Sequence, residues 1–258
     1  MNIKKLAIGG GIAVVVLIAA VWWLFFSGDT PEAVDVDAAN AQLDADLAGD
    51  DTADAGTADA GTDAPANPDP FDGDINATWV VDDVIGEFDF ETASGSFAGF
   101  RVDEELTIGE VVAVGRTGGV TGTVTIEGGQ LTGTDITVEM GSITSNDSRR
   151  EFPIRRAVMA EDFPTATFVL TSPVDLPAGL ADGETVTVEA TGDLTVAGTT
   201  NEATFTINAL VRDDGFGVIT GSTTITWEDY GVTPPNAPIV VSIDESGIVE
   251  FQLIVTKG

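Results

Sequence analysis

Four arginines in the segment SNDSRREFPIRR, residues 145–156, are the side chains best suited to hold a polar ligand. They supply four of the ten basic residues of a chain whose formal net charge is −33. A guanidinium group forms paired hydrogen bonds with carboxylates and phosphates. The cluster therefore suits an ion-paired brace, a clamp for the headgroup of a ligand, or a catalytic site. Its members are Arg149, Arg150, Arg155 and Arg156.

Few other residues in this chain could take part in catalysis. The absence of Cys and His excludes Ser-His-Asp and Cys-His machinery, zinc sites built on imidazole or thiolate, and disulfides. The motif WEDYGV holds Glu228, Asp229 and Tyr230, but neighbours on a strand point to opposite faces and do not share one site. We therefore predict no catalytic residue and no metal site. The sequence pI near 4.1 also argues against nucleic acid as a partner, because phosphate binding needs a basic surface.

The N-terminus carries an uncharged apolar run over residues 6–26. As a helix this run would be roughly 31 Å long, which matches one hydrocarbon core. It is longer than the apolar core of a cleaved signal peptide and lacks a clean cleavage site. Lys4 and Lys5 precede it and acidic residues follow, so the N-terminus is expected in the cytoplasm. We predict that residues 1–26 are an uncleaved single-pass anchor in the cell membrane and that the rest is extracytoplasmic.

Residues 27–76 are built mainly from Asp, Ala, Gly, Thr and Pro, without a basic residue. The pentapeptide TADAG occurs twice in succession, at 52–56 and 57–61. A segment of this composition buries too little apolar surface to offset the entropy lost on ordering. We therefore predict a disordered acidic linker that holds the following domain away from the membrane.

Residues 77–258 alternate apolar and polar positions with the period of β-strands. In VTGTVTIEGGQLTGTDITVEM, Val120, Val124 and Ile126 share one face, and a Gly-rich turn separates them from a second alternating run. The same pattern recurs to the C-terminus without intervening helical periodicity. It predicts an antiparallel all-β domain, and periodicity alone fits both a sandwich and a barrel.

One short helix interrupts this pattern, and it carries the arginine cluster. Ser148 and Glu151 have the spacing of a capping box, and Pro153 suits the first position of a helix. We expect this helix to continue to about Ala160, before Phe163 and Pro164 lead into the next strand.

Several segments of the β region resemble the bacterial YceI-like family, in the order in which that family has them. They are SFAGFRVDEEL, VVAVGRTGGVTGTVTIEGG, MGSITSNDSRREFPIRRAVMAEDFPTATF, GDLTVAGTTNEATFTI and WEDYGVTPP. The resemblance covers residues 78–256. The family often has an Arg-Asp-x-His-Leu stretch where this chain has Arg150 and Glu151, and the chain has no His. Any ligand role of that His therefore does not carry over.

The resemblance implies an extended, antiparallel up-and-down β-barrel of the lipocalin-like kind. Such barrels hold the isoprenoid chain of a quinone or polyprenyl lipid in an apolar cavity, and the family is not known for enzymes. No other cofactor is expected, and a homodimer remains open at this stage. The aromatic residues expected to line the cavity are Trp79, Phe88, Phe90, Phe97, Phe100, Phe168, Phe205, Phe216 and Trp227.

With this fold in view, a brace is the favoured interpretation of the arginines, because structural ion pairs are common. The alternative places them at the mouth of the cavity, where they would hold a quinone carbonyl or a polyprenyl phosphate. We expect a division, with Arg150 paired to Glu151 and Arg155 or Arg156 nearer the mouth.

Together these observations predict a membrane-tethered carrier of an isoprenoid lipid. The alternative is a structural or adhesive β-domain displayed on an acidic stalk. The interior distinguishes the two, since a carrier needs an apolar cavity and a stalk module has a filled core.

Overall fold

The computed structural model describes residues 30–53, 68–86 and 88–258. The predicted anchor, residues 1–26, lies outside the described residues, and so does the part of the predicted linker over residues 54–67. Within the described ranges, no helix is both long enough and apolar enough to cross a membrane.

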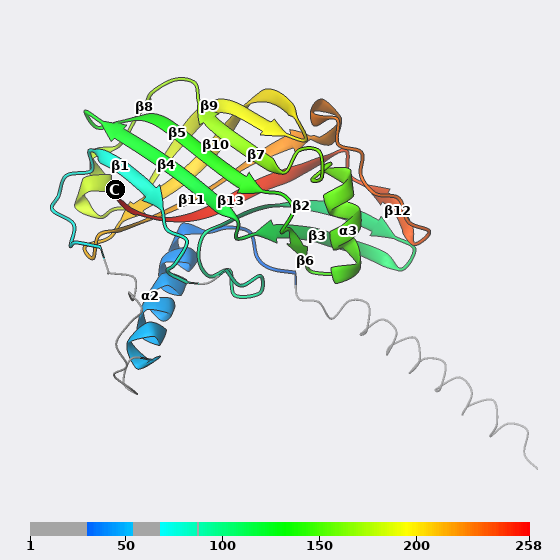
Figure 1. The fold of residues 1–258 in the computed structure, drawn as a ribbon, viewed down its shortest axis with the longest axis horizontal. Helices are drawn as coiled ribbons and strands as arrows, with labels where there is room; N and C mark the ends of the chain where they lie inside the picture. The colour runs from blue at the N-terminus through cyan, green and yellow to red at the C-terminus, as the bar shows by residue number, and fades with distance from the viewer. Residues whose placement is uncertain (1–29, 54–67, 87) are drawn as a thin grey trace, which may run out of the picture. The chain divides into compact units, whose positions relative to one another are not determined.

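Thirteen strands form one antiparallel sheet, eight of which close into a barrel. Closure occurs where β1 pairs with β4 on one side and with β13 on the other. The wall runs in the order β1, β4, β5, β7, β9, β10, β11 and β13 (Figure 1). The strands are β1 (Ala77–Val81), β2 (Phe97–Leu106), β3 (Gly109–Thr117), β4 (Val120–Glu127), β5 (Gln130–Glu139), β6 (Thr144–Ser145), β7 (Thr165–Leu170), β8 (Val174–Asp175), β9 (Val186–Val196), β10 (Thr199–Val211), β11 (Phe216–Thr226), β12 (Val240–Ile243) and β13 (Ser246–Lys257).

Alternation along the strands explains how the wall separates an inside from an outside. On β10, Ala203, Phe205 and Ile207 are buried, whereas Thr204 and Thr206 between them are exposed. The hairpin between β4 and β5 turns at two glycines with positive φ, Gly128 at 61° and Gly129 at 76°, which favours glycine at both positions. The predicted all-β antiparallel barrel is thus confirmed.

The sheet extends beyond the barrel because β13 is longer than the strand that closes it. Residues 255–257 of β13 pair with β1, while residues 248–252 pair with β2. Strand β2 then pairs with β3 and β12, and β3 pairs with β6. This extension continues the inner face of the barrel as far as helix α3 (Ser148–Ala157). Ile154 of this helix packs in a cluster with Ile143 and Val158. Two short 3₁₀ helices, η1 (Ala178–Asp182) and η2 (Trp227–Tyr230), lie further along the chain.

Part of the predicted linker is a helix instead. Helix α2 (Val36–Ala53) begins after Asp35, whose side chain accepts hydrogen bonds from the backbone N–H groups of Asp37 and Ala38. Val36, Ala39 and Leu43 recur at helical spacing and are at most 5% exposed. The average composition of residues 27–76 hid this local apolar face, and the predicted disorder is corrected for residues 36–53.

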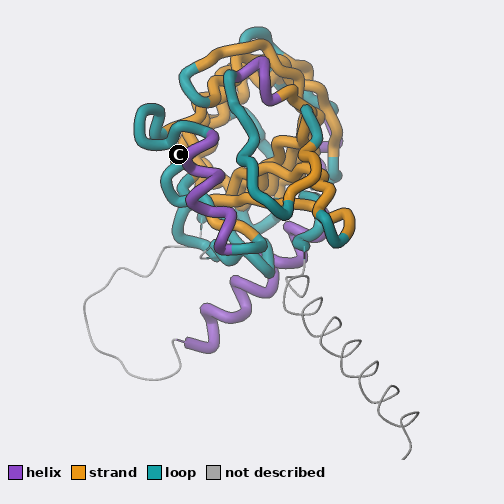
Figure 2. The backbone as a smooth tube through the Cα atoms, turned by 90° about the vertical axis from the view of Figure 1, so that its right-hand side faces the viewer, coloured by secondary structure: helices purple, strands orange, loops and turns teal. Residues whose placement is uncertain are grey.

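Helix α2 packs on the outer surface of the barrel wall (Figures 1 and 2). Its three buried residues form a cluster with the outward side chains of Phe216, Val218 and Ile254 on β11 and β13. Arg212 at the end of β10 adds polar contacts: its guanidinium donates to Asn40 Oδ1 at 2.6 Å and pairs with Asp44 at 2.8 Å. The helix therefore covers outward apolar side chains that would otherwise contact water.

We predict that Leu43→Asp detaches helix α2 while the barrel stays folded. Leu43 is 2% exposed, and burying an unpaired carboxylate there is unfavourable. Hydrogen exchange should show lost protection over residues 36–48 and unchanged protection in β4 and β5. Ala45→Asp is the matched control, since residue 45 is exposed on the same helix. Equal protection of α2 in both variants would contradict the packing described here.

Candidate functional site

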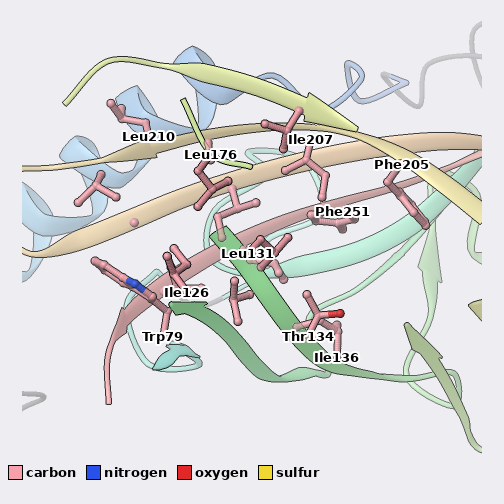
Figure 3. Close-up of a pocket in the computed structure, with 18 of the residues that line it drawn as sticks. Trp79, Ile126, Leu131, Thr134, Ile136, Leu176, Phe205, Ile207, Leu210 and Phe251 are labelled. Carbon is pink, nitrogen blue, oxygen red and sulfur yellow. The ribbon is translucent and has the colours of Figure 1, made fainter. Parts of the chain in front are cut away.

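An apolar cavity lies inside the barrel (Figure 3). Its volume is about 110 Å³, counted as the space open to the centres of water-sized molecules. Among the lining side chains, only Trp79 and Thr134 carry polar atoms, and both bond to the backbone: Trp79 Nε1 donates to Ile75 O, and Thr134 Oγ1 accepts from Leu170 N. Other lining residues include Val124, Ile126, Leu131, Ile136, Leu176, Val188, Ile207, Ala209, Leu210, Ile219, Leu253 and Val255.

This lining determines what the cavity can hold. With no free hydrogen-bonding group, it offers nothing to replace the hydration of a charge, so a charged group inside would be strongly disfavoured. An apolar chain instead contributes roughly 0.8 kcal/mol for each buried CH₂. The barrel interior therefore suits a long hydrocarbon ligand and no charged one.

Aromatic rings close one end of the cavity. Phe168 and Phe205 meet edge to face with ring centroids 5.0 Å apart, and Phe205 lies 5.6 Å from Phe251. Figure 3 shows Phe205 and Phe251 at the end opposite Leu210 and Trp79. Such ring pairs are favourable beyond their buried area, so they stabilise the packing at this end.

A second, smaller cavity of about 80 Å³ lies where the sheet extends beyond the barrel. Phe100, Val102 and Glu104 of β2 form its floor, with helix α3 and the segment around η2 on the other sides. Glu104 is 7% exposed, and its Oε2 accepts a hydrogen bond from Arg150 Nη2 at 2.8 Å. This cavity thus combines an apolar lining with one ion pair, and the remaining lining residues are Ala113, Ile154, Ala157, Val158, Trp227, Val232, Pro234, Pro235 and Ile243.

The nine predicted aromatic residues divide among three places. Trp79, Phe168 and Phe205 line the barrel cavity. Phe100 and Trp227 line the second cavity, where their rings meet edge to face at 6.0 Å. The other four, Phe88, Phe90, Phe97 and Phe216, line neither cavity.

The prediction for these four is corrected by the direction of each strand. Phe97 pairs with Gln252 and Phe216 precedes the cavity-lining Gly217, so both point outward under alternation. Both are nevertheless buried, because helix α2 covers Phe216 and Phe88 packs on Phe97. Phe88 and Phe90 precede β2 in the loop that leads from β1.

Comparison with known proteins agrees with this architecture. The sequence model of the YceI-like domain matches residues 88–255. The chain belongs to the YceI-like family. A polyisoprenoid-binding domain from Saccharophagus degradans, implicated in plant cell wall breakdown, is 17% identical with a TM-score of 0.53, and the match covers 71% of this chain and 100% of that one. No curated protein matches the chain.

Other solved structures match a smaller part of this YceI-like chain. BcnA of Burkholderia cenocepacia is 19% identical with a TM-score of 0.47, over 62% of this chain and 96% of its own. The YceI protein of Campylobacter jejuni is 15% identical with a TM-score of 0.42, over 54% of this chain and 81% of its own. At these identities, the likeness to the Saccharophagus domain shows the fold alone.

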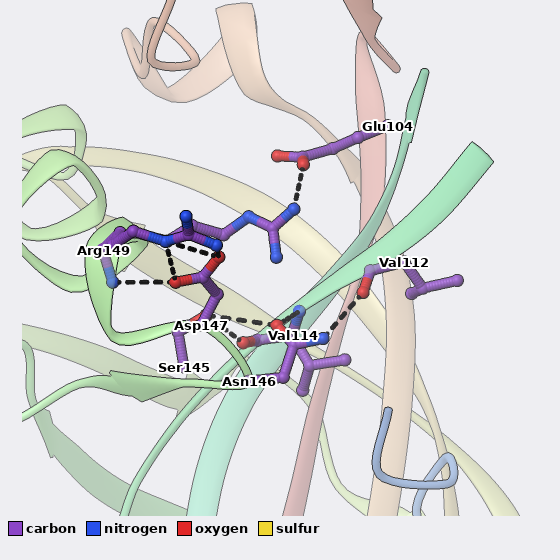
Figure 4. Close-up of polar contacts among 8 residues, drawn as sticks. Glu104, Val112, Val114, Ser145, Asn146, Asp147 and Arg149 are labelled. Atoms are coloured by element: carbon purple, nitrogen blue, oxygen red, sulfur yellow. Dashed lines mark hydrogen bonds and ion pairs between the residues drawn. The ribbon is translucent and has the colours of Figure 1, made fainter. Parts of the chain in front are cut away.

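The arginines of the cluster mainly form ion pairs and hydrogen bonds with neighbouring groups of the protein (Figure 4). Arg149 pairs with Asp147 at 2.7 Å, and Arg155 donates to Ile143 O. Arg150 pairs with Glu104 rather than with Glu151, which corrects the predicted partner. Glu151 instead lies 3.7 Å from Arg155, one helical turn away, and Arg156 is exposed. Of these two cavities, the barrel cavity contacts none of the four arginines and the second contacts Arg150 alone.

The start of helix α3 also differs from the prediction. Asp147, not Ser148, caps the helix by accepting a hydrogen bond from the backbone N–H of Arg149 at 3.0 Å. Pro153 lies inside the helix rather than at its first position, and the helix ends at Ala157. Asp147 is a better cap here because its carboxylate also pairs with the Arg149 side chain.

We predict that Asp147 makes the stability of this YceI-like domain sensitive to acid. Hydrogen bonds from the Arg149 side chain hold the pKa of the Asp147 carboxyl below its usual value. A carboxyl whose pKa is lower in the folded state than in the unfolded state stabilises the fold at pH values above its unfolded-state pKa. This stabilisation is lost as the pH falls through the folded-state pKa. Between about pH 5 and pH 2, the melting temperature should therefore fall less steeply with pH in Asp147→Asn than in the wild type. Exposed Asp193→Asn is the control, and identical slopes in all three proteins would contradict the prediction.

The carboxylates of WEDYGV do not form a site in this YceI-like domain. The segment is the 3₁₀ helix η2 rather than a strand, with Glu228 and Asp229 exposed and Tyr230 buried. Burial raises the pKa of Tyr230, so its hydroxyl stays protonated at neutral pH. In the described part of the chain, no three acidic side chains come close enough together to hold a metal ion.

One polar cluster was missed by the sequence analysis. Glu250 of β13 accepts hydrogen bonds from Arg101 at 3.0 Å and from Arg116 at 2.7 Å, on the outer side of the wall. The backbone carbonyls of Pro31 and Glu32 accept from the same two arginines, so the segment before α2 completes the cluster. Its three charged side chains lie far apart in sequence, and only strand register brings them together.

Proposed function

We propose that this protein binds the isoprenoid chain of a quinone or polyprenyl lipid inside the barrel. The observation that carries the proposal is the cavity lined by apolar side chains whose few polar atoms are already bonded. Family membership and the shared fold of a polyisoprenoid-binding domain support the same ligand class. A stalk module with a filled core would not have this cavity, so the carrier is favoured over the adhesive alternative.

The proposed carrier is held at the outer surface of the cell membrane by residues 1–26. The support is the uncharged run over residues 6–26 and the lysines before it. Pro31 and Glu32 are attached to the barrel through Arg101 and Arg116, only a few residues after that run. The proposed carrier would take the lipid from the bilayer and return it there.

A chain-length series tests this function. The full chain in phosphatidylcholine nanodiscs is equilibrated with prenols of increasing length, and native mass spectrometry counts protein with bound prenol. Because each buried CH₂ adds to affinity, binding should strengthen with each isoprene unit until the cavity is filled and then level off. Absence of bound prenol at every length, from a folded protein, would refute the proposal and favour the stalk module.

A further inference from the structure

The two cavities are neighbours along one face of the same strand pair. Ala98 lines the barrel cavity and Phe100 lines the second cavity, two positions further along β2. Positions two apart on a strand share a face and lie roughly 7 Å apart. On the paired strand, Phe251 lies opposite Ala98 and Val249 lies opposite Phe100. Both cavities therefore lie over the inner face of β2 and β13.

Aromatic side chains stand at this junction. Phe251 lines the barrel cavity and contacts Phe205, while Phe100 lines the second cavity and contacts Trp227. Side-chain rotation changes such contacts without breaking the hydrogen bonds of the sheet. A chain lying in the barrel can therefore extend past these rings into the second cavity.

The polar side chains of the second cavity have hydrogen-bonding capacity that the other described residues leave unfilled. Glu104 Oε2 accepts from Arg150 Nη2, whereas Glu104 Oε1 has no hydrogen-bond partner among the described residues and is not sealed from solvent. The Arg150 side chain is 22% exposed and donates this one hydrogen bond to another side chain. Around them the lining is apolar, apart from the ring nitrogen of Trp227, which donates to Asp244 O. The cavity thus presents one acceptor and one donor group side by side in an apolar setting.

We propose that the second cavity holds the polar end of the isoprenoid and selects a neutral hydroxyl or phenol over a phosphate. This inference rests on the proposed function, since it places the head of the lipid whose tail lies in the barrel. A hydroxyl donates to Glu104 Oε1 and accepts from Arg150, which satisfies both groups. The ion pair is formally neutral, so it offers no net positive charge to an anion.

A phosphate, unlike a hydroxyl, is disfavoured beside the Glu104–Arg150 pair. It would lie beside the Glu104 carboxylate in a site where water screens charge weakly, and like charges repel strongly there. To gain Arg150 it would have to displace Glu104, which would then be buried without its partner. The remaining three arginines of the cluster line neither cavity and cannot compensate from within it.

The test compares geranylgeraniol with geranylgeranyl phosphate, which share a tail and differ in the head. We expect the wild-type full chain in nanodiscs to bind the alcohol about tenfold more tightly, as measured by native mass spectrometry. Glu104→Gln keeps the shape and leaves Arg150 with a net charge, so it should lower this preference about tenfold by tighter phosphate binding. Glu151→Gln removes the same charge from helix α3 outside both cavities and should leave the preference unchanged.

The outcomes separate this inference from the proposed function. If wild type and Glu104→Gln bind the alcohol but show the same preference, the head lies elsewhere and the inference fails alone. If the wild type binds neither lipid, the proposed function fails as well. A head-labelled diazirine analogue of geranylgeraniol gives a second measurement without mutation: cross-links to Phe100, Trp227 or Val232 support the inference. Cross-links confined to η1, at the other end of the barrel cavity, would overturn it.

Discussion

Replacing Glu250 with glutamine is expected to lower the free energy of unfolding by about 3–5 kcal/mol. Glu250 and Arg116 are each 1% exposed, and their contact of 2.7 Å is the most buried ion pair among the described residues. Burial lowers the pKa of the Arg116 guanidinium, and the hydrogen bond that it donates to Glu250 opposes that shift. Without the carboxylate, the guanidinium groups of Arg101 and Arg116 would remain largely buried with only carbonyl partners. Urea unfolding, followed by far-ultraviolet circular dichroism, measures the loss.

Two further variants make this prediction specific. Glu202→Gln removes a charge from the exposed face of β10 and should change stability by less than about 0.5 kcal/mol. The double variant Glu250→Met with Arg116→Met removes both members of the pair and should be more stable than Glu250→Gln. A Glu250→Gln protein as stable as the Glu202→Gln control would show that the cluster does not hold the wall and the N-terminal segment together.

Placing tryptophan at Ala209 is expected to abolish isoprenoid binding. Ala209 lines the barrel cavity from β10, so an indole there occupies space that the lipid needs. Expelling a single five-carbon unit forfeits roughly 4 kcal/mol, at about 0.8 kcal/mol for each carbon. This corresponds to about a thousandfold loss of affinity. Native mass spectrometry of the full chain with geranylgeraniol measures the change.

Thr206→Trp is the matched control for this variant. It adds the same ring to the same strand, but position 206 is exposed on the outer face. Its affinity should stay within about threefold of the wild type, and both variants should melt cooperatively. Unchanged binding by folded Ala209→Trp would mean that the lipid does not enter the barrel.

The barrel itself was predictable because alternation is a local property of each strand. Val120, Val124 and Ile126 were expected to share a face, and all three line the cavity. Closure into a barrel was not a local property, and its prediction came from the family resemblance rather than from periodicity. Register within the sheet decides which aromatic residues point inward. Phe97 and Phe216 were therefore wrongly expected to line the cavity.

Helix α2 shows why average composition can mislead. Residues 36–48 contain enough Asp and Ala to resemble the rest of the acidic segment, yet Val36, Ala39 and Leu43 form a helical stripe after a capping Asp35. The stripe becomes meaningful only against the outward side chains of β11 and β13, which sequence alone did not place. The Glu104–Arg150 pair was hidden for a similar reason, since 46 positions separate its members.

The most direct test of the account is the identity of whatever the protein carries. The full chain is purified from a bacterial host, extracted with organic solvent, and the extract is quantified by mass spectrometry beside that of Ala209→Trp. We predict about one isoprenoid lipid per wild-type molecule and almost none in the variant. An extract without isoprenoid, even after incubation of folded protein with isoprenoid-loaded vesicles, would contradict the claim that the barrel is a lipid carrier.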